Sequence, residues 1–111
     1  MNKDISNNLF CFILGATDYG RIRGMIFNAE ETKSRFYNVW EDSGVQCGTG
    51  IGLYIDGFLN GMEMAGVDFE DFEVHALEAV NHLNERYNMG LSPAKEVAGW
   101  VTMVHMNGGC V

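Results

Sequence analysis

Two histidines and four carboxylates recur at spacings of three and four residues in the second half of the chain. They are Asp68, Asp71, His75, Glu78, His82 and Glu85. Residues three and four apart share one face of an α-helix, so this spacing predicts a polar stripe of acids and imidazoles. His75, Glu78 and His82 would all lie within reach of one divalent metal ion, or could relay protons. One helix offers at most three ligands and nothing in the sequence identifies a fourth. We therefore interpret the stripe as a solvated or partner-facing surface and predict no metal and no other cofactor.

Cys47 is the second residue with a chemical role to consider, because it precedes a predicted helix start in the glycine-rich run 46–52. Exposed N–H groups and the helix dipole lower the pKa of a thiol at such a position. A general base would have to be His75, His82 or His105, and His105 would be a plausible partner if it lay on a strand. A lone cysteine in a glycine-rich turn is, however, more often small and buried than reactive. We predict no catalytic site, with a small cysteine hydrolase that uses Cys47 and His105 as the alternative.

Charge is distributed unevenly along the chain. Residues 36–85 contain ten carboxylates and no Lys or Arg, whereas five of the seven bases lie in residues 1–35, and the net charge is −8. Such an acidic surface repels phosphate, which argues against direct binding to nucleic acid or to an anionic membrane. A concentration of like charge of this kind either keeps a protein soluble or meets a basic partner.

Length and composition predict one domain that spans residues 1–111, since 47% of the residues are hydrophobic and can form a single core. The apolar run Leu9–Ala16 is too short for a membrane span or a signal peptide, so we expect a cytoplasmic protein. The three cysteines, Cys11, Cys47 and Cys110, are odd in number and lack a metal-binding spacing, which predicts free thiols.

The elements that must position these residues are predicted to form an α+β fold. The short apolar run Leu9–Leu14 is typical of a buried strand, residues 17–20 have turn chemistry, and residues 21–28 alternate like a second strand. This N-terminal β-hairpin would pack against three to four helices. We expect those helices at residues 29–40, 49–65, 68–90 and from 93 onward. Residues 99–106 favour helix slightly, and as a strand they would complete a three-stranded antiparallel sheet.

Gly57 and Gly61 lie inside a predicted helix, where each costs about 1 kcal/mol relative to alanine. We expect them where another backbone approaches closely. If they do not pack within the chain, they would offer a flat groove for a homodimer.

The predicted hairpin Asp18-Tyr19-Gly20-Arg21-Ile22-Arg23-Gly24, followed by an acidic helix start at residues 28–31, resembles the opening of ArdA-type antirestriction proteins. The matching positions are Tyr19, Gly20 and Gly24, within about thirty residues. That family consists of acidic plasmid and transposon proteins that imitate the phosphate track of DNA. This chain is shorter, has Met25-Ile26 where an aromatic residue is expected, and concentrates its acids after residue 40.

Charge and resemblance together predict a small acidic inhibitor that presents carboxylates to a basic, nucleic-acid-binding partner. Phage and plasmid anti-restriction or anti-CRISPR proteins are of this class. The predicted partner-binding residues are Glu41, Asp42, Asp68, Glu70, Asp71, Glu78 and Glu85. They would take the place of phosphates in a Lys/Arg groove of the partner.

Overall fold

The computed structural model describes the backbone of residues 2–43 and 50–107 and the side chains of residues 7–38 and 50–104. Within these residues the chain forms five α-helices and no strand, so the predicted α+β fold is wrong. The helices are α1 (Asn2–Arg23), α2 (Ala29–Ser43), α3 (Gly50–Met64), α4 (Phe72–Tyr87) and α5 (Pro93–Asn107).

The predicted β-hairpin is replaced by α1, which contains both the apolar run and the supposed turn. Phe12, Ala16 and Tyr19 are buried at helical spacing, whereas Phe10 in the same run is 64% exposed. A short continuous apolar run does not reveal its period, and here helical burial overrides the strand preference of its aromatic and branched residues.

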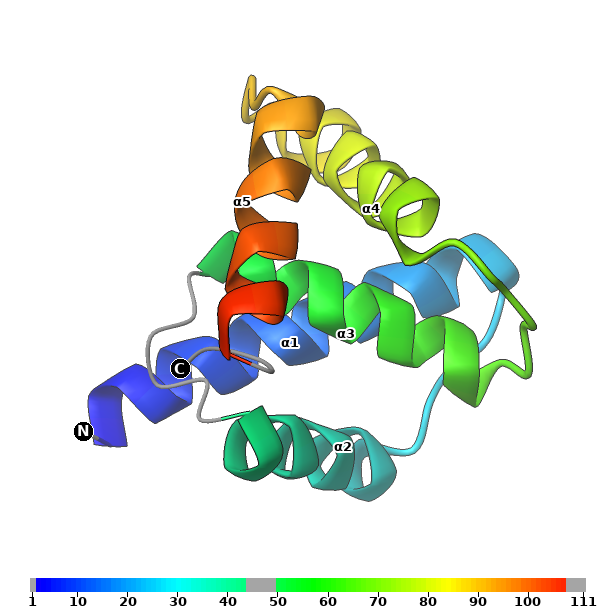
Figure 1. Cartoon of the computed structure of the whole chain (residues 1–111). Coiled ribbons are helices and arrows are strands. Elements are labelled where there is room, and N and C mark those ends of the chain that lie inside the picture. The colour runs from blue at the N-terminus through cyan, green and yellow to red at the C-terminus, as the bar shows by residue number, and fades with distance from the viewer. Residues whose placement is uncertain (1, 44–49, 108–111) are drawn as a thin grey trace.

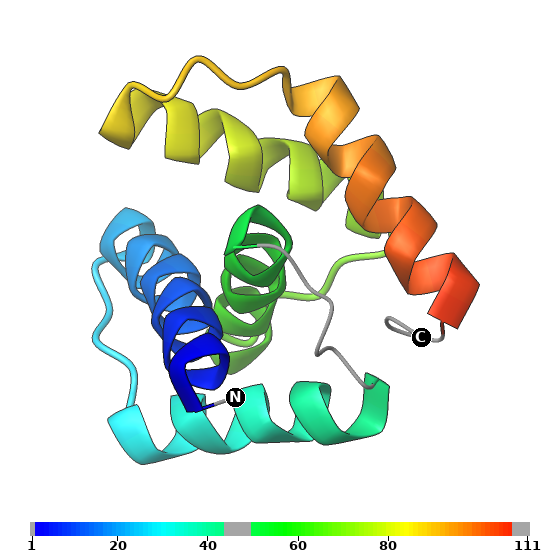
Figure 2. The same ribbon diagram turned by 90° about the vertical axis from the view of Figure 1, so that its left-hand side faces the viewer.

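Helices α1 and α3 lie side by side at the centre of the molecule (Figures 1 and 2). Figure 2 shows α2 crossing on one side of this pair, while α4 and α5 cover the other side. The central pair therefore separates α2 from the α4–α5 hairpin.

Glycines allow the backbones of α1 and α3 to touch. A Cβ atom on Gly57 would overlap the carbonyl oxygen of Phe12, and one on Gly15 would overlap that of Tyr54. A Cβ on Gly61 would also be tight, at 3.1 Å from the Cβ of Tyr19. The predicted close backbone approach at Gly57 and Gly61 is thus confirmed. Their partner is α1, so they do not form the exposed groove considered for a homodimer.

The main core joins α3 to α1, α4 and α5. Its largest buried side chains come from α3 and include Tyr54, Ile55 and Phe58, which pack against Ala76 and Val80 of α4. A smaller cluster attaches α2 to the central pair. It consists of Phe12, Phe36 and Leu53, with the rings of Phe12 and Phe36 in an edge-to-face contact at 5.5 Å.

The four later helices are confirmed, with differences at their ends. Helix α4 begins at Phe72 and not at residue 68, and Asp71 caps it, because the Asp71 side chain accepts hydrogen bonds from the backbone N–H groups of Glu73 and Val74. Asn88 ends α4 in the left-handed conformation (φ 54°). Thr49, the first residue of the predicted helix 49–65, lies outside the described residues.

Residues 99–106 are helical, so the strand alternative for them is wrong. Asn84 helps to turn the chain from α4 into α5, since its side-chain amide bonds both the N–H and the carbonyl of Leu91 at 2.8 and 2.9 Å. No helix in the described part of the chain is long and apolar enough to cross a bilayer.

Candidate functional site

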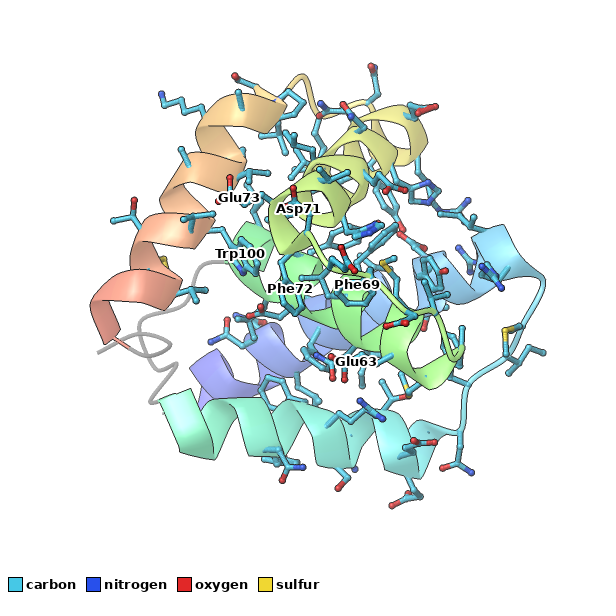
Figure 3. The ribbon with its side chains drawn as sticks, turned by 45° about the vertical axis from the view of Figure 1, so that its right-hand side comes forward. Glu63, Phe69, Asp71, Phe72, Glu73 and Trp100 are labelled. Carbon is cyan, nitrogen blue, oxygen red and sulfur yellow. The ribbon has the colours of Figure 1, made fainter. Side chains whose placement is uncertain are left out.

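A groove of about 620 Å³ opens between α3, the start of α4 and α5. It is lined by Asp56, Leu59, Asn60, Glu63, Glu70, Asp71, Phe72, Glu73, Trp100, Val101 and Val104. Figure 3 shows this side of the molecule, with Glu63 on α3, Phe72 at the start of α4 and Trp100 on α5. We refer to it as the acidic groove, because five of its eleven lining residues are carboxylates.

The floor of the acidic groove is apolar and aromatic. Trp100 and Val101 of α5 are half-buried, while Phe72 is 51% exposed and Val104 is 39% exposed. The ring of Phe72 is held edge-to-face by Phe69, with the ring centroids 5.0 Å apart. Apolar side chains that remain this exposed in a concave surface are typical of a binding site.

Carboxylates surround this floor on three elements. Asp56 and Glu63 come from α3, Glu70 and Asp71 from the connection that follows it, and Glu73 from the first turn of α4. Among the described side chains, a single base pairs with any of these five. It is Arg35 of α2, which lies 3.0 Å from Oε1 of Glu63 and also donates to Asn60. The groove therefore carries an excess of negative charge.

Asp56 is the deepest of the five carboxylates. Burial raises the pKa of its side chain to about 6, although a hydrogen bond from the Trp100 indole partly opposes this shift. The bond joins the indole nitrogen to Oδ1 of Asp56 at 3.0 Å. Within the described side chains no Lys or Arg pairs with Asp56, so none of them neutralises its charge. A carboxylate in this position would gain from an external cation.

The predicted partner-binding residues divide into three groups. Glu70 and Asp71 line the acidic groove, and Asp68 is exposed in the same connection. Glu78 and Glu85 are exposed on α4 but do not line the groove. The backbone of Glu41 and Asp42 is in α2, and their side chains lie outside the described residues.

Only part of the predicted polar stripe of α4 is exposed to solvent. Nδ1 of His75 lies 2.8 Å from Oε1 of Glu78, so these two residues satisfy each other. His82 is half-buried, its ring lies 6.2 Å from that of Phe58, and its Nε2 atom is buried with no hydrogen-bond partner in the described part of the chain. Within that part, no group of three potential ligands is arranged to hold a metal ion.

Neither of the two residues of the cysteine hydrolase alternative, Cys47 and His105, has its side chain among those that the structure describes. Cys47 lies outside the described residues, as does Cys110. The backbone of His105 belongs to α5 and not to a strand, while its side chain is not described. Cys11 is half-buried on α1, where burial raises the pKa of its thiol.

Asp56, Glu63, Glu73 and Trp100 line the groove but were not predicted as site residues. Asp56 and Glu63 lie seven residues apart on the polar side of the predicted helix, and this spacing is the signal that would have placed them on one face. No comparable signal exists for Trp100, because its position against α3 depends on how α5 folds back.

A second polar cluster lies between α1, α3 and α4. The carboxylate of Asp18 is fully buried and accepts hydrogen bonds from the hydroxyls of Tyr54 (2.8 Å) and Tyr87 (2.9 Å). Its other oxygen faces Arg21 at 3.4 Å and Arg86 at 3.5 Å. Burial and the bond to Asp18 raise the pKa of both tyrosines. Because its polar groups are paired with one another, we interpret this cluster as a structural link between three helices.

Comparison of the chain with protein-family models, with curated proteins and with solved structures found no match. The acidic groove is therefore the feature that supports a functional proposal.

Proposed function

We propose that this chain is a non-enzymatic binding protein that presents carboxylates to a basic, nucleic-acid-binding partner, as an anti-restriction or anti-CRISPR inhibitor does. The observation that supports it is the acidic groove, where five carboxylates from three elements surround an apolar floor. Arg35 is the single base that pairs with any of the five among the described side chains. The exposed acids Asp68, Glu78 and Glu85 extend the same charge over the connection before α4 and along α4 itself.

In this mechanism the carboxylates occupy the positions that phosphates take in the partner's nucleic-acid site. Complementary charge accelerates encounter and excludes nucleic acid from the same surface. Because exposed charges are screened over about 8 Å at physiological ionic strength, association should weaken as salt rises.

The test compares two variants of equal net charge. The first neutralises four exposed acids with Asp68→Asn, Glu70→Gln, Glu78→Gln and Glu85→Gln. Asp71 is left unchanged, because its side chain caps α4 and its loss would destabilise the helix. The second keeps the acids and adds four lysines at exposed positions of α1 and α2, with Asn7→Lys, Thr17→Lys, Ser34→Lys and Asn38→Lys. Both variants change the net charge from −8 to −4.

Each protein is immobilised, exposed to bacterial lysate and eluted with duplex DNA, and the eluted proteins are identified by mass spectrometry. The unmodified chain and the lysine variant should retain basic nucleic-acid-binding proteins that DNA releases, whereas the neutralised variant should not. Equal retention by all three, or retention that DNA does not reverse, would contradict phosphate imitation. Circular dichroism checks that each variant is folded.

A further inference from the structure

The acidic groove combines two features that select for one kind of cation. Its floor is built from the aromatic side chains of Phe72 and Trp100, and Phe72 is half exposed. Its deepest polar group is the Asp56 carboxylate, which no described Lys or Arg pairs with. A ligand for this place must therefore be apolar enough to lie on aromatic rings and must carry positive charge.

Arginine meets both requirements better than lysine does. A guanidinium is planar, stacks on aromatic faces and binds a carboxylate through two parallel N–H groups. It is also more weakly hydrated than an ammonium, so it loses less when it enters a half-buried site. An ammonium would have to shed a tightly held water shell to reach Asp56 over the same floor.

We propose that the acidic groove binds an arginine side chain of a basic partner segment, with its guanidinium on the Phe72 and Trp100 floor and paired with Asp56. The proposal rests on the proposed function, and it adds the chemistry that the partner must present. Glu70 and Glu73 at the rim are exposed and receive further basic residues of the same segment. Glu63 is already paired with Arg35, so Asp56 is the main carboxylate for the incoming guanidinium.

The experiment uses two capped amphipathic peptides of equal length and charge, one with arginines and the other with lysines at the same positions. Binding is measured by calorimetry at physiological salt. It is measured again by fluorescence in a Trp40→Phe background, where Trp100 is the remaining one of the two tryptophans. The arginine peptide should bind about tenfold more tightly than the lysine peptide and should change the Trp100 emission.

Two variants locate the site. Asp56→Asn keeps an acceptor oxygen for Trp100 but removes the charge. This variant should bind the arginine peptide about tenfold more weakly. Phe72→Ala removes an exposed ring without opening the core, so it should fold and should reduce the preference for arginine. Glu30→Gln removes one charge from the exposed first turn of α2, outside the groove, and should change affinity less than about twofold.

The outcomes separate this inference from the proposed function. Equal affinity for the two peptides, or equal loss in Asp56→Asn and Glu30→Gln, would overturn the arginine site even if lysate capture by the acidic surface stands. If neither peptide binds, the arginine site is also overturned. If the peptides bind as expected but no captured protein is released by DNA, the groove is an arginine site and phosphate imitation is wrong.

Discussion

Oδ1 of Asp56 accepts a hydrogen bond of 3.0 Å from the indole nitrogen of Trp100, and this bond joins α3 to α5 within the acidic groove. The same two residues supply a carboxylate and an aromatic surface to the groove. One contact thus contributes both to the packing of α5 and to the chemistry that we assign to the site.

Replacing Asp56 with Asn should stabilise the protein at neutral pH. Burial raises the pKa of Asp56 from 3.8 to about 6, so between these values the folded chain binds a proton more tightly than the unfolded chain. The contribution of this site to stability is therefore most favourable below about pH 4 and falls by about 2 kcal/mol as pH rises to 6. Asp56→Asn removes this loss and should raise Tm at pH 7.

Thermal unfolding at pH 5 and pH 7 measures this effect. The difference in Tm between the two pH values should change in Asp56→Asn, because the variant no longer titrates there. Glu30→Gln, which removes an exposed carboxylate, should leave that difference as in the unmodified protein. An Asp56→Asn protein with an unchanged difference would show that this carboxylate does not titrate as described.

Gly57→Ala should destabilise the protein even though alanine is the better helix former. The added methyl group would overlap the carbonyl oxygen of Phe12, so α1 and α3 would have to separate. Overpacking of this kind costs about 1–3 kcal/mol, which exceeds the gain of about 1 kcal/mol in helix propensity. Gly99→Ala is the matched control, because it lies in α5 and the new methyl group would meet no atom within 4 Å apart from its chain neighbours and the backbone of its own helix. It should stabilise by about 1 kcal/mol in chemical denaturation.

These glycines also show what the sequence could predict about the fold. Inside a segment with a clear helical period, Gly57 and Gly61 indicated close backbone contact, and the structure confirms it. The segment that makes this contact was misassigned, because residues 9–14 are continuously apolar and have no visible period. The partner helix was therefore predicted as a hairpin, although its buried residues Phe12, Ala16 and Tyr19 have helical spacing.

The candidate site was predictable only in part for a similar reason. Glu70 and Asp71 were identified from charge, which is visible in the sequence, and both line the acidic groove. Asp56 and Trp100 lie 44 residues apart, and they meet only because α5 folds back onto α3. Local spacing cannot indicate a contact that tertiary packing creates.

Tyr54→Phe should destabilise the protein more than Tyr87→Phe. Both hydroxyls donate to Oδ2 of Asp18 at nearly equal distances of 2.8 and 2.9 Å. Tyr54 is 2% exposed, so water cannot replace its hydroxyl and Oδ2 is left with Tyr87 as its one tyrosine donor, at a cost of about 1–3 kcal/mol. Tyr87 is 38% exposed, and water can replace its hydroxyl, so we expect a cost of less than about 1 kcal/mol. Chemical denaturation of both variants measures the two costs, and equal values would contradict the role assigned to burial.

Removal of metal ions should leave the protein unchanged. His75 and Glu78 already bond each other at 2.8 Å, and Nε2 of His82 is buried. EDTA should therefore not shift Tm, and the purified protein should hold no stoichiometric zinc after dialysis. One tightly held zinc per chain by elemental analysis would refute this expectation.

His82→Leu should raise the free energy of unfolding by about 1 kcal/mol. Nε2 of His82 is buried with no hydrogen-bond partner in the described part of the chain, and an unpaired buried nitrogen of this kind costs about 1–3 kcal/mol. Leucine has a similar volume and would pack against Phe58 without a polar atom, so most of that cost should be recovered. His75→Leu is the control, because that imidazole is bonded to Glu78 and its replacement removes a satisfied contact. Urea denaturation of the two variants should therefore give opposite changes, and a destabilised His82→Leu would contradict the cost assigned to the unpaired nitrogen.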